Sequence, residues 1–266
     1  MFRSVQQDNG GFTLVELIAV IVVLAITSVV GGGFVVSVVD QYQKAQLRST
    51  LVQRGTVTME QLARQLRMSV PNSLRVSTGG DCVEFMPLIG GAFYTEELPD
   101  AENNKAVVDS VDTVEFSLLD GTPSQILVAP LDSTEIYTVA VPSARIAAGD
   151  FGVAPYSQAV FSGNHRFLRN SSSRRLLLAE QPKRFCIVGS QLIRYEGYGL
   201  DTGGISSASP GGTSVLMSAS LEAEGSAFVL TSGSEDRNAA LLISLRFADR
   251  GESVLLNSRV LVRNAP

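Results

Sequence analysis

The chain has 266 residues and a formal net charge of −5. An acidic balance of this kind argues against a nucleic-acid-binding surface, and we expect no nucleic-acid partner. There is one histidine, His165, and the two cysteines, Cys82 and Cys186, are far apart, so the sequence offers neither a histidine cluster nor a Cys-x-x-Cys pair for a metal. We expect no metal and no other cofactor, with a calcium site built from carboxylates of separate loops as the alternative that the sequence leaves open.

A long apolar segment begins close to the N-terminus. No charged residue occurs from Leu17 to Val39, and roughly 20 apolar residues suffice to span a bilayer. Glu16 is the charge at the start of the segment, and a polar leader before it ends in Gly10-Gly11. No small-residue cleavage site closes the segment, which distinguishes it from a conventional secretory signal. The pattern predicts a transmembrane helix over residues 12–39.

Residues 40–70 continue the helix with an amphipathic pattern. Met59, Leu62, Leu66 and Val70 recur at the spacing of one helix face. Pro71 stops this pattern. One helix from near residue 12 to about residue 68 is therefore predicted, and its second half should pack on a globular head.

Three consecutive glycines, Gly31, Gly32 and Gly33, interrupt the apolar segment. Each costs about 0.8–1 kcal/mol relative to alanine within a helix. One interpretation is a soft point that unwinds or stretches when subunits leave the bilayer and stack. The other is a small-residue face for close contact between helices, and the two are compatible.

After Pro71 the apolar residues follow the period of β-strands. The predicted strands span residues 83–86, 114–118, 125–128, 136–141, 185–188, 191–195, 240–247 and 254–262. Gly189-Ser190 and residues 249–252 should connect two hairpins, and 90–91, 171–173 and 203–212 are predicted loops. The fold class is therefore α+β, with a long N-terminal helix packed on a large antiparallel β-sheet head at residues 71–266.

No arrangement of catalytic residues stands out, and we expect the chain not to be an enzyme. The acidic pairs are interpreted as solvated faces, and they are Glu96 with Glu97, Asp100 with Glu102, and Glu222 with Glu224. Ser162 lies near His165 in sequence, but such proximity does not make a triad, and His165 is expected in a loop or the core. Aromatic pairs could line a sugar site, although packing explains them more simply, and they are Phe93-Tyr94, Phe161 with Phe167, and Tyr195 with Tyr198.

The run Gly11-Phe12-Thr13-Leu14-Val15-Glu16 resembles the prepilin signature of type IV pilins and type II secretion pseudopilins. The resemblance implies that a prepilin peptidase removes leader residues 1–11 by cutting after Gly11, and that Phe12 is then N-methylated. It also implies that Glu16 pairs with the N-terminal amine of a neighbouring subunit. Its expected partners are the peptidase, other pilin subunits, the inner-membrane assembly machinery and membrane lipid. The expected location is the inner membrane, single-pass with a periplasmic head, and then a pilus or pseudopilus.

In an exported head of this kind, Cys82 and Cys186 are expected to form one disulfide. Closing so long a loop would stabilise the head by about 4–5 kcal/mol through chain entropy. Two buried free thiols are the alternative.

Scattered blocks of the head resemble minor prepilins of the mannose-sensitive haemagglutinin (MSHA) pilus family, and they are residues 70–76, 82–85, 174–178, 185–189, 192–198 and 262–266. The chain departs from that pattern at Lys183-Arg184, where uncharged residues are expected. The resemblance implies a minor pilin that primes or caps the filament. The alternatives are a type II secretion minor pseudopilin, a membrane-anchored surface- or glycan-binding protein, and an anchored envelope enzyme.

Overall fold

The computed structural model describes residues 11, 13–118, 121–138, 140–222, 225–231 and 238–262. The predictions for Phe12 and for the leader before Gly11 lie outside these residues. The chain divides into two compact units, one ending at Thr50 and the other beginning at Leu51. The second unit is the head together with the C-terminal part of the long helix.

Helix α1, Leu14–Arg67, is a single helix of 54 residues, close to the predicted limits. The hydroxyl of Thr13 accepts a hydrogen bond of 3.3 Å from the backbone N–H of Glu16 and thereby caps the first turn. From Leu14 to Val39 every residue of α1 is exposed. From Leu51 onward one face is buried, and it includes the predicted stripe residues Met59, Leu62 and Leu66.

The head is built mostly of antiparallel strands. In chain order the elements are β1 (Arg75–Val76), β2 (Cys82–Phe85), β3 (Leu88–Phe93), β4 (Val108–Phe116), β5 (Gln125–Leu127), α2 (Ser133–Tyr137), β6 (Arg145–Ala147), β7 (Tyr156–His165), β8 (Arg175–Ala179), β9 (Lys183–Val188), β10 (Gln191–Glu196), β11 (Thr213–Ala219), β12 (Leu221–Glu222), β13 (Phe228–Thr231), β14 (Ala239–Asp249) and β15 (Glu252–Val262). This confirms the predicted α+β class.

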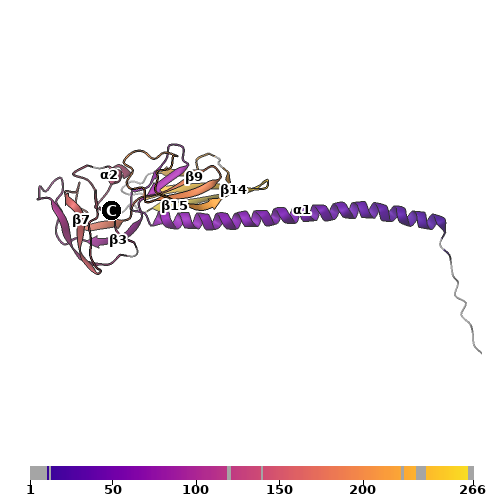
Figure 1. Cartoon of the computed structure of the whole chain (residues 1–266), viewed down its shortest axis with the longest axis horizontal. Coiled ribbons are helices and arrows are strands. Elements are labelled where there is room, and N and C mark those ends of the chain that lie inside the picture. The colour runs from indigo at the N-terminus through magenta and orange to yellow at the C-terminus, as the bar shows by residue number, and fades with distance from the viewer. Residues whose placement is uncertain are drawn as a thin grey trace, which may run out of the picture. The chain divides into compact units, whose positions relative to one another are not determined.

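Two sheets pack with α1 to form the helix-side lobe. One sheet has the order β1-β2-β9-β10-β11, and in the other β12 and β13 pair with one side of β14 while β15 pairs with β14 as well. Their shared core contains Leu62 and Leu66 of α1, Phe85 and Phe185 of the first sheet, and Phe247 of the second. Figure 1 shows β9, β14 and β15 gathered beside the C-terminal part of α1.

Residues 88–179 form a second, inserted lobe, in which Figure 1 shows β3 and β7. It holds a sheet of order β3-β8-β5-β6 and the two-stranded pair β4-β7. Strands β2 and β9 pair with each other directly, as Val83 opposite Phe185 shows, so the whole lobe is inserted between two neighbouring strands. Its first and last residues, Leu88 and Ala179, also lie opposite each other.

Both predicted hairpins are present. β9 and β10 pair from Val188 opposite Gln191, and Gly189 at the turn has φ 59°. β14 and β15 pair from Asp249 opposite Glu252, and the two residues between them, Arg250 and Gly251, both have positive φ. Two consecutive positive φ values are what a type I′ hairpin turn needs, because its twist matches that of the strands.

The predicted strand over residues 136–141 is wrong. Its first residues belong to the short helix α2, which Asp132 caps by accepting a 3.0 Å hydrogen bond from the N–H of Glu135. Arg169 then holds Glu135 with two hydrogen bonds of 2.7 Å. A local cap and a distant ion pair therefore overrode the β-propensity of these residues.

The predicted loop at Gly90-Gly91 is also wrong, because both residues lie within β3. Gly91 is opposite Leu177, and a Cβ there would lie 3.3 Å from the carbonyl oxygen of Leu176. Close approach of the neighbouring strand explains glycine here better than a turn does.

Candidate functional site

The N-terminal site is built on the first turn of α1. Gly11 and Glu16 are both exposed. Thr13 and Glu16 have the spacing of a capping box, in which the acidic residue also faces the positive end of the helix dipole. Glu16 therefore stabilises its own helix start locally, besides the intersubunit role that the resemblance implies. Phe12, the remaining predicted residue of this site, lies outside the described part of the chain.

The apolar residues of α1 that follow this first turn are not covered by any other part of the first unit. α1 is long and apolar enough to cross a membrane, and residues such as Leu17 and Val29 remain exposed. Added Cβ atoms at Gly31, Gly32 and Gly33 would meet nothing within 4 Å. Packing within the first unit thus gives no reason for these glycines, and both interpretations of them stay predictions.

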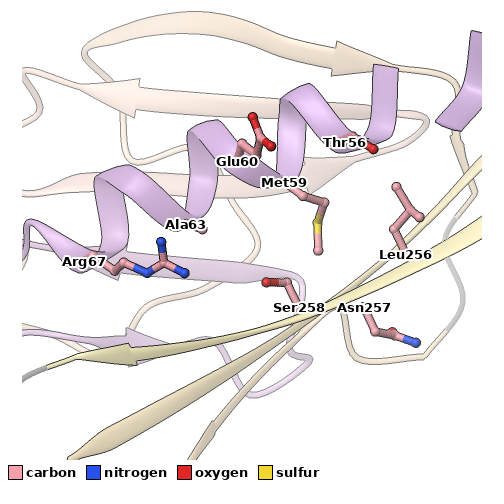
Figure 2. Close-up of a pocket in the computed structure, with 8 residues that line it drawn as sticks. All are labelled: Thr56, Met59, Glu60, Ala63, Arg67, Leu256, Asn257 and Ser258. Atoms are coloured by element: carbon pink, nitrogen blue, oxygen red, sulfur yellow. The ribbon is translucent and has the colours of Figure 1, made fainter. Parts of the chain in front are cut away.

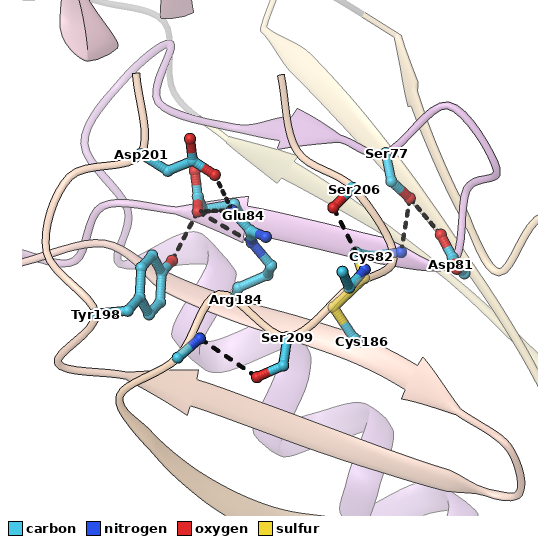
Figure 3. Close-up of a disulfide and its surroundings, with 12 residues drawn as sticks. Ser77, Asp81, Cys82, Glu84, Arg184, Cys186, Tyr198, Asp201, Ser206 and Ser209 are labelled. Carbon is cyan, nitrogen blue, oxygen red and sulfur yellow. Dashed lines mark hydrogen bonds and ion pairs between the residues drawn. A yellow bond between two sulfur atoms is a disulfide. The ribbon is translucent and has the colours of Figure 1, made fainter. Parts of the chain in front are cut away.

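Cys82 and Cys186 form the predicted disulfide (Figure 3). They lie opposite each other on β2 and β9 with Cα atoms 4.1 Å apart. The N–H of Ile187 donates to the carbonyl of Asp81 at 2.9 Å, which leaves the cysteines at the adjacent non-hydrogen-bonded position, where antiparallel strands are closest. The bond joins residues 104 positions apart, and the inserted lobe lies between them in sequence. The disulfide therefore links the two strands from which the lobe begins and ends.

Beside the disulfide lies a charge cluster with a buried centre, which comprises Arg75, Glu84, Arg184, Tyr198 and Asp201. Figure 3 shows four of these residues, Glu84, Arg184, Tyr198 and Asp201. Glu84 is fully buried, and its carboxylate accepts hydrogen bonds from Arg184 at 2.8 Å and from the Tyr198 hydroxyl at 2.7 Å. Arg75 also pairs with Glu84, and Arg184 bonds to Asp201 at 2.8 Å. Two positive and two negative groups compensate one another, which the two buried charges, Glu84 and Arg184, require.

The electrostatics of the cluster follow from burial and pairing. Burial raises the pKa of the Tyr198 hydroxyl, and the neighbouring Glu84 carboxylate raises it further. Burial alone would raise the pKa of Asp201, but hydrogen bonds from Arg184 and from the N–H of Gly203 outweigh it and hold that pKa below its usual value. Tyr198 therefore stays a neutral donor and Asp201 a charged acceptor, which are structural roles.

The cluster ties down the glycine- and serine-rich loop after β10. Arg75 donates to the carbonyl oxygens of Asp201 and Gly203, both at 2.6 Å. Ile205, further along the loop, packs with the disulfide. The sequence predicted residues 203–212 as a loop but did not predict these contacts. In the sequence, the only indication of the cluster was the unexpected charge at Arg184. Its partner Glu84 is 100 positions away.

The remaining candidate residues serve packing or local structure. Asp100 is buried, so its interpretation as a solvated face is wrong. It accepts backbone hydrogen bonds from Glu102 and Asn103 and a 2.6 Å bond from Asn170. Glu96 and Glu97 are exposed as expected, and Glu224 lies outside the described residues.

His165 is buried at the end of β7, with Nε2 3.2 Å from the carbonyl oxygen of Ser143. Its ring lies 4.6 Å from that of Phe167, which also packs edge-to-face on Phe161 at 5.6 Å. These contacts place His165 in the core. The sequence had predicted either a loop or the core for this residue. Within the described ranges, no group of three His, Cys, Asp or Glu side chains is arranged to hold a metal ion.

A protein-family comparison matches residues 7–32 to the prokaryotic N-terminal methylation motif. The match includes Gly11 and Glu16 and ends within the glycine run. Comparison of the chain with curated proteins and with solved structures found no match. The chain thus carries a prepilin-type methylation motif at the start of an apolar helix, which supports a membrane-anchored type IV pilin-like or pseudopilin protein and implies processing by prepilin peptidase and assembly with other pilins.

Proposed function

We propose that the protein is a minor pilin of an MSHA-type type IV pilus that primes or caps the filament. The observation that carries the proposal is the methylation motif at the start of an exposed apolar helix that ends in a large head. The blocks of head sequence similar to the MshO minor prepilin support the assignment to this pilus type. A head enlarged by an inserted lobe suits a subunit of low copy number better than the shaft.

Processing acts on the peptide bond between Gly11 and Phe12. Hydrolysis there releases the leader and creates a new amine on Phe12, which is then methylated. Gly11 is exposed and has no side chain, so the bond is open to a peptidase from the side of Gly11. The capped first turn at Thr13 begins directly after the cleavage site.

Assembly is driven by pairing of Glu16 in the membrane. A carboxylate at the centre of a bilayer costs about 2.5–3.5 kcal/mol on insertion scales, and less near the interface. The N-terminal amine of a neighbouring subunit would offset that cost only in the assembled state. Pairing therefore disfavours the free monomer and fixes the axial position of each helix.

The motif is equally compatible with a minor pseudopilin of a type II secretion system. Deletion of the gene separates the two possibilities, since loss of surface pili supports the first and loss of protein secretion the second. We propose no catalytic activity for the head, because the candidate groups Asp100 and His165 are engaged in structural contacts, as is the buried Glu84.

The decisive experiment is N-terminal mass spectrometry of the protein isolated from membranes. We expect a mature chain that starts with methylated Phe12, and a chain that keeps its first eleven residues would contradict the proposal. Gly11→Ala should leave the uncut prepilin. Glu16→Ala should be cut normally yet enter filaments poorly, and Glu16→Asp, which keeps the charge, is the matched control.

A further inference from the structure

A groove of about 510 Å³ runs along the helix-side lobe between α1 and β15 (Figure 2). Its residues are Thr56, Met59, Glu60, Ala63 and Arg67 from α1 and Leu256, Asn257 and Ser258 from β15. Met59 and Ala63 are buried and form an apolar floor with Leu256. Glu60 and Arg67 are exposed at the rim and carry opposite charges.

The groove begins where helix and strand touch. A Cβ at Gly55 would overlap Cδ1 of Leu256 and lie 3.0 Å from the ring of Phe247. From there the lining extends along α1 from Thr56 to Arg67, which is about 16 Å at 1.5 Å per residue. An extended peptide of about five residues covers that length at 3.4 Å per residue.

The strand that forms the other wall has a free edge. β15 pairs with β14 along its whole length, from Glu252 to Val262, and no other described strand pairs with it. An antiparallel strand with one partner leaves alternate backbone N–H and C=O groups unpaired on its outer side. These groups require hydrogen-bond partners, either water or another backbone.

This edge also lacks the features that usually keep strand edges from pairing. β15 contains no proline, no lysine and no glycine, and its two charged residues are Glu252, next to the hairpin turn, and Arg259. Leu255 and Leu261 leave 46% and 54% of their surface exposed. Natural edge strands normally carry charges, prolines or bulges that prevent the addition of a further strand, so this one is open to a partner.

We propose that the groove binds an extended segment of a different protein chain, which adds to the free edge of β15 as a further strand. Backbone hydrogen bonds to β15 supply the affinity, as in other cases of strand addition. An apolar side chain of the segment lies on the floor at Met59 and Ala63. A cationic side chain faces Glu60 and an anionic one faces Arg67, which fixes the direction of the segment.

A helix is a poorer occupant than a strand. The backbone groups of a helix already pair within it, so a bound helix would leave the edge of β15 unsatisfied. A strand satisfies the edge and requires only the 4.7–4.9 Å spacing between neighbouring strands.

A second copy of this chain is also a poorer occupant, an argument that rests on the proposed function. Two β15 edges would pair antiparallel about a two-fold axis normal to the sheet. Because residues 51–67 of α1 pack on this sheet, such an axis would reverse their direction in the partner. Chains anchored in one membrane by the N-terminal ends of their helices share a direction.

The test uses the full-length protein in detergent micelles and fluorescent eight-residue peptides. One peptide alternates valine and threonine and carries lysine toward one end and glutamate toward the other. A second has these charges exchanged, and a third is a helix-forming peptide of equal charge. We expect fluorescence polarisation to show binding of one strand peptide in preference to the other two, with slowed amide hydrogen exchange in β15.

The charge-swapped variant Glu60→Arg/Arg67→Glu tests the recognition. Both residues are exposed, so the variant should melt like the parent. It should bind the preferred peptide about tenfold more weakly and the charge-exchanged peptide about tenfold more tightly, as expected for two exposed ion pairs. Arg64→Glu, on the same helix but outside the groove lining, is the control and should leave both affinities unchanged.

Several results would overturn the proposal. These are no peptide binding up to about 1 mM, binding without slower exchange in β15, preference for the helical peptide, or an unchanged preference in the swapped variant. Peptide binding does not require removal of the leader. The Gly11→Ala chain should therefore bind equally well, and the outcome is separate from that of the processing experiment.

Discussion

The two ends of α1 show how one helix uses the same residue types in opposite ways. Leu24 in the N-terminal part is 57% exposed, whereas Leu62 in the C-terminal part is completely buried. Both side chains suit a helix, and the difference lies in what covers them. The head supplies the cover for residues 51–67. The apolar surface of residues 14–39 has no cover within its own unit, and a bilayer or another subunit would supply burial energy of about 25 cal/mol per Å².

Glycines show the same contrast. Gly55 is required because Leu256 and Phe247 occupy the space of a side chain. Gly31, Gly32 and Gly33 have nothing within 4 Å of an added Cβ, although they weaken the helix by about 3 kcal/mol in total. Substitutions in the C-terminal part should therefore affect stability of the head, and substitutions in the N-terminal part should affect assembly.

The largest effect is expected from removing the disulfide. The double variant Cys82→Ser/Cys186→Ser should lower the free energy of unfolding of the head by about 2–5 kcal/mol, because the unfolded chain regains the entropy of a long loop. Urea denaturation followed by fluorescence measures this. Identical unfolding curves with and without reductant would contradict it, while N-terminal processing should be unaffected.

Leucine truncations test the comparison directly. Leu62→Ala should destabilise the head by about 2–5 kcal/mol, since it opens a cavity in the core. Leu24→Ala should leave head unfolding unchanged, because that side chain has no cover within its unit. Equal losses in the two variants would show that the two parts of the helix are not supported differently.

Alanine at the glycines should give smaller effects of opposite sign. Gly55→Ala should destabilise the head by about 1–3 kcal/mol through overpacking against Leu256. Gly32→Ala should strengthen the helix by about 0.8–1 kcal/mol. If the glycine run is a soft point, Gly32→Ala should also lower the yield of filaments, and pilus counts by electron microscopy would show this.

The smallest effect concerns pH and lies in the inserted lobe. Burial lowers the pKa of His165; the hydrogen bond to the Ser143 carbonyl opposes this shift, and nearby Arg145 adds to it. A lowered folded-state pKa means that the stabilising contribution is present above about pH 6.5 and is lost as the pH falls below that value. The loss is at most about 1.4 kcal/mol per pH unit.

Urea denaturation at pH 7 and pH 5.5 measures this loss. His165→Gln keeps a polar side chain without the titration and should remove the pH dependence in that range. A parent protein equally stable at both values would contradict the prediction.

The parts of the fold that the sequence predicted well have strong local signals. The apolar run, the stripe through Leu62 and the stop at Pro71 locate α1, and Arg250-Gly251 locates the last hairpin. The wrong predictions concern segments whose secondary structure depends on contacts with residues distant in sequence. The helix α2 depends on Arg169, and the strand position of Gly91 depends on Leu176, neither of which can be read from the local pattern.

The functional residues also divide into those with a local sequence signal and those brought together only by folding. Gly11 and Glu16 were found because the methylation motif is contiguous in sequence. The cluster around Glu84 and the groove between α1 and β15 were missed, because each joins segments that meet only in the folded head. Arg184 was recognised as an unexpected charge, but its role follows only from its position opposite Glu84.

The inserted lobe enters and leaves the rest of the head at one place, with Leu88 and Ala179 side by side and the disulfide just below them. The lobe nevertheless packs on the rest of the head, because Leu127 and Ile136 of the lobe share a buried core with Met86. A foreign segment added to an outer loop of the lobe should therefore leave the head folded, whereas deletion of residues 88–179 would expose the apolar side chains of Val70 and Met86 to water.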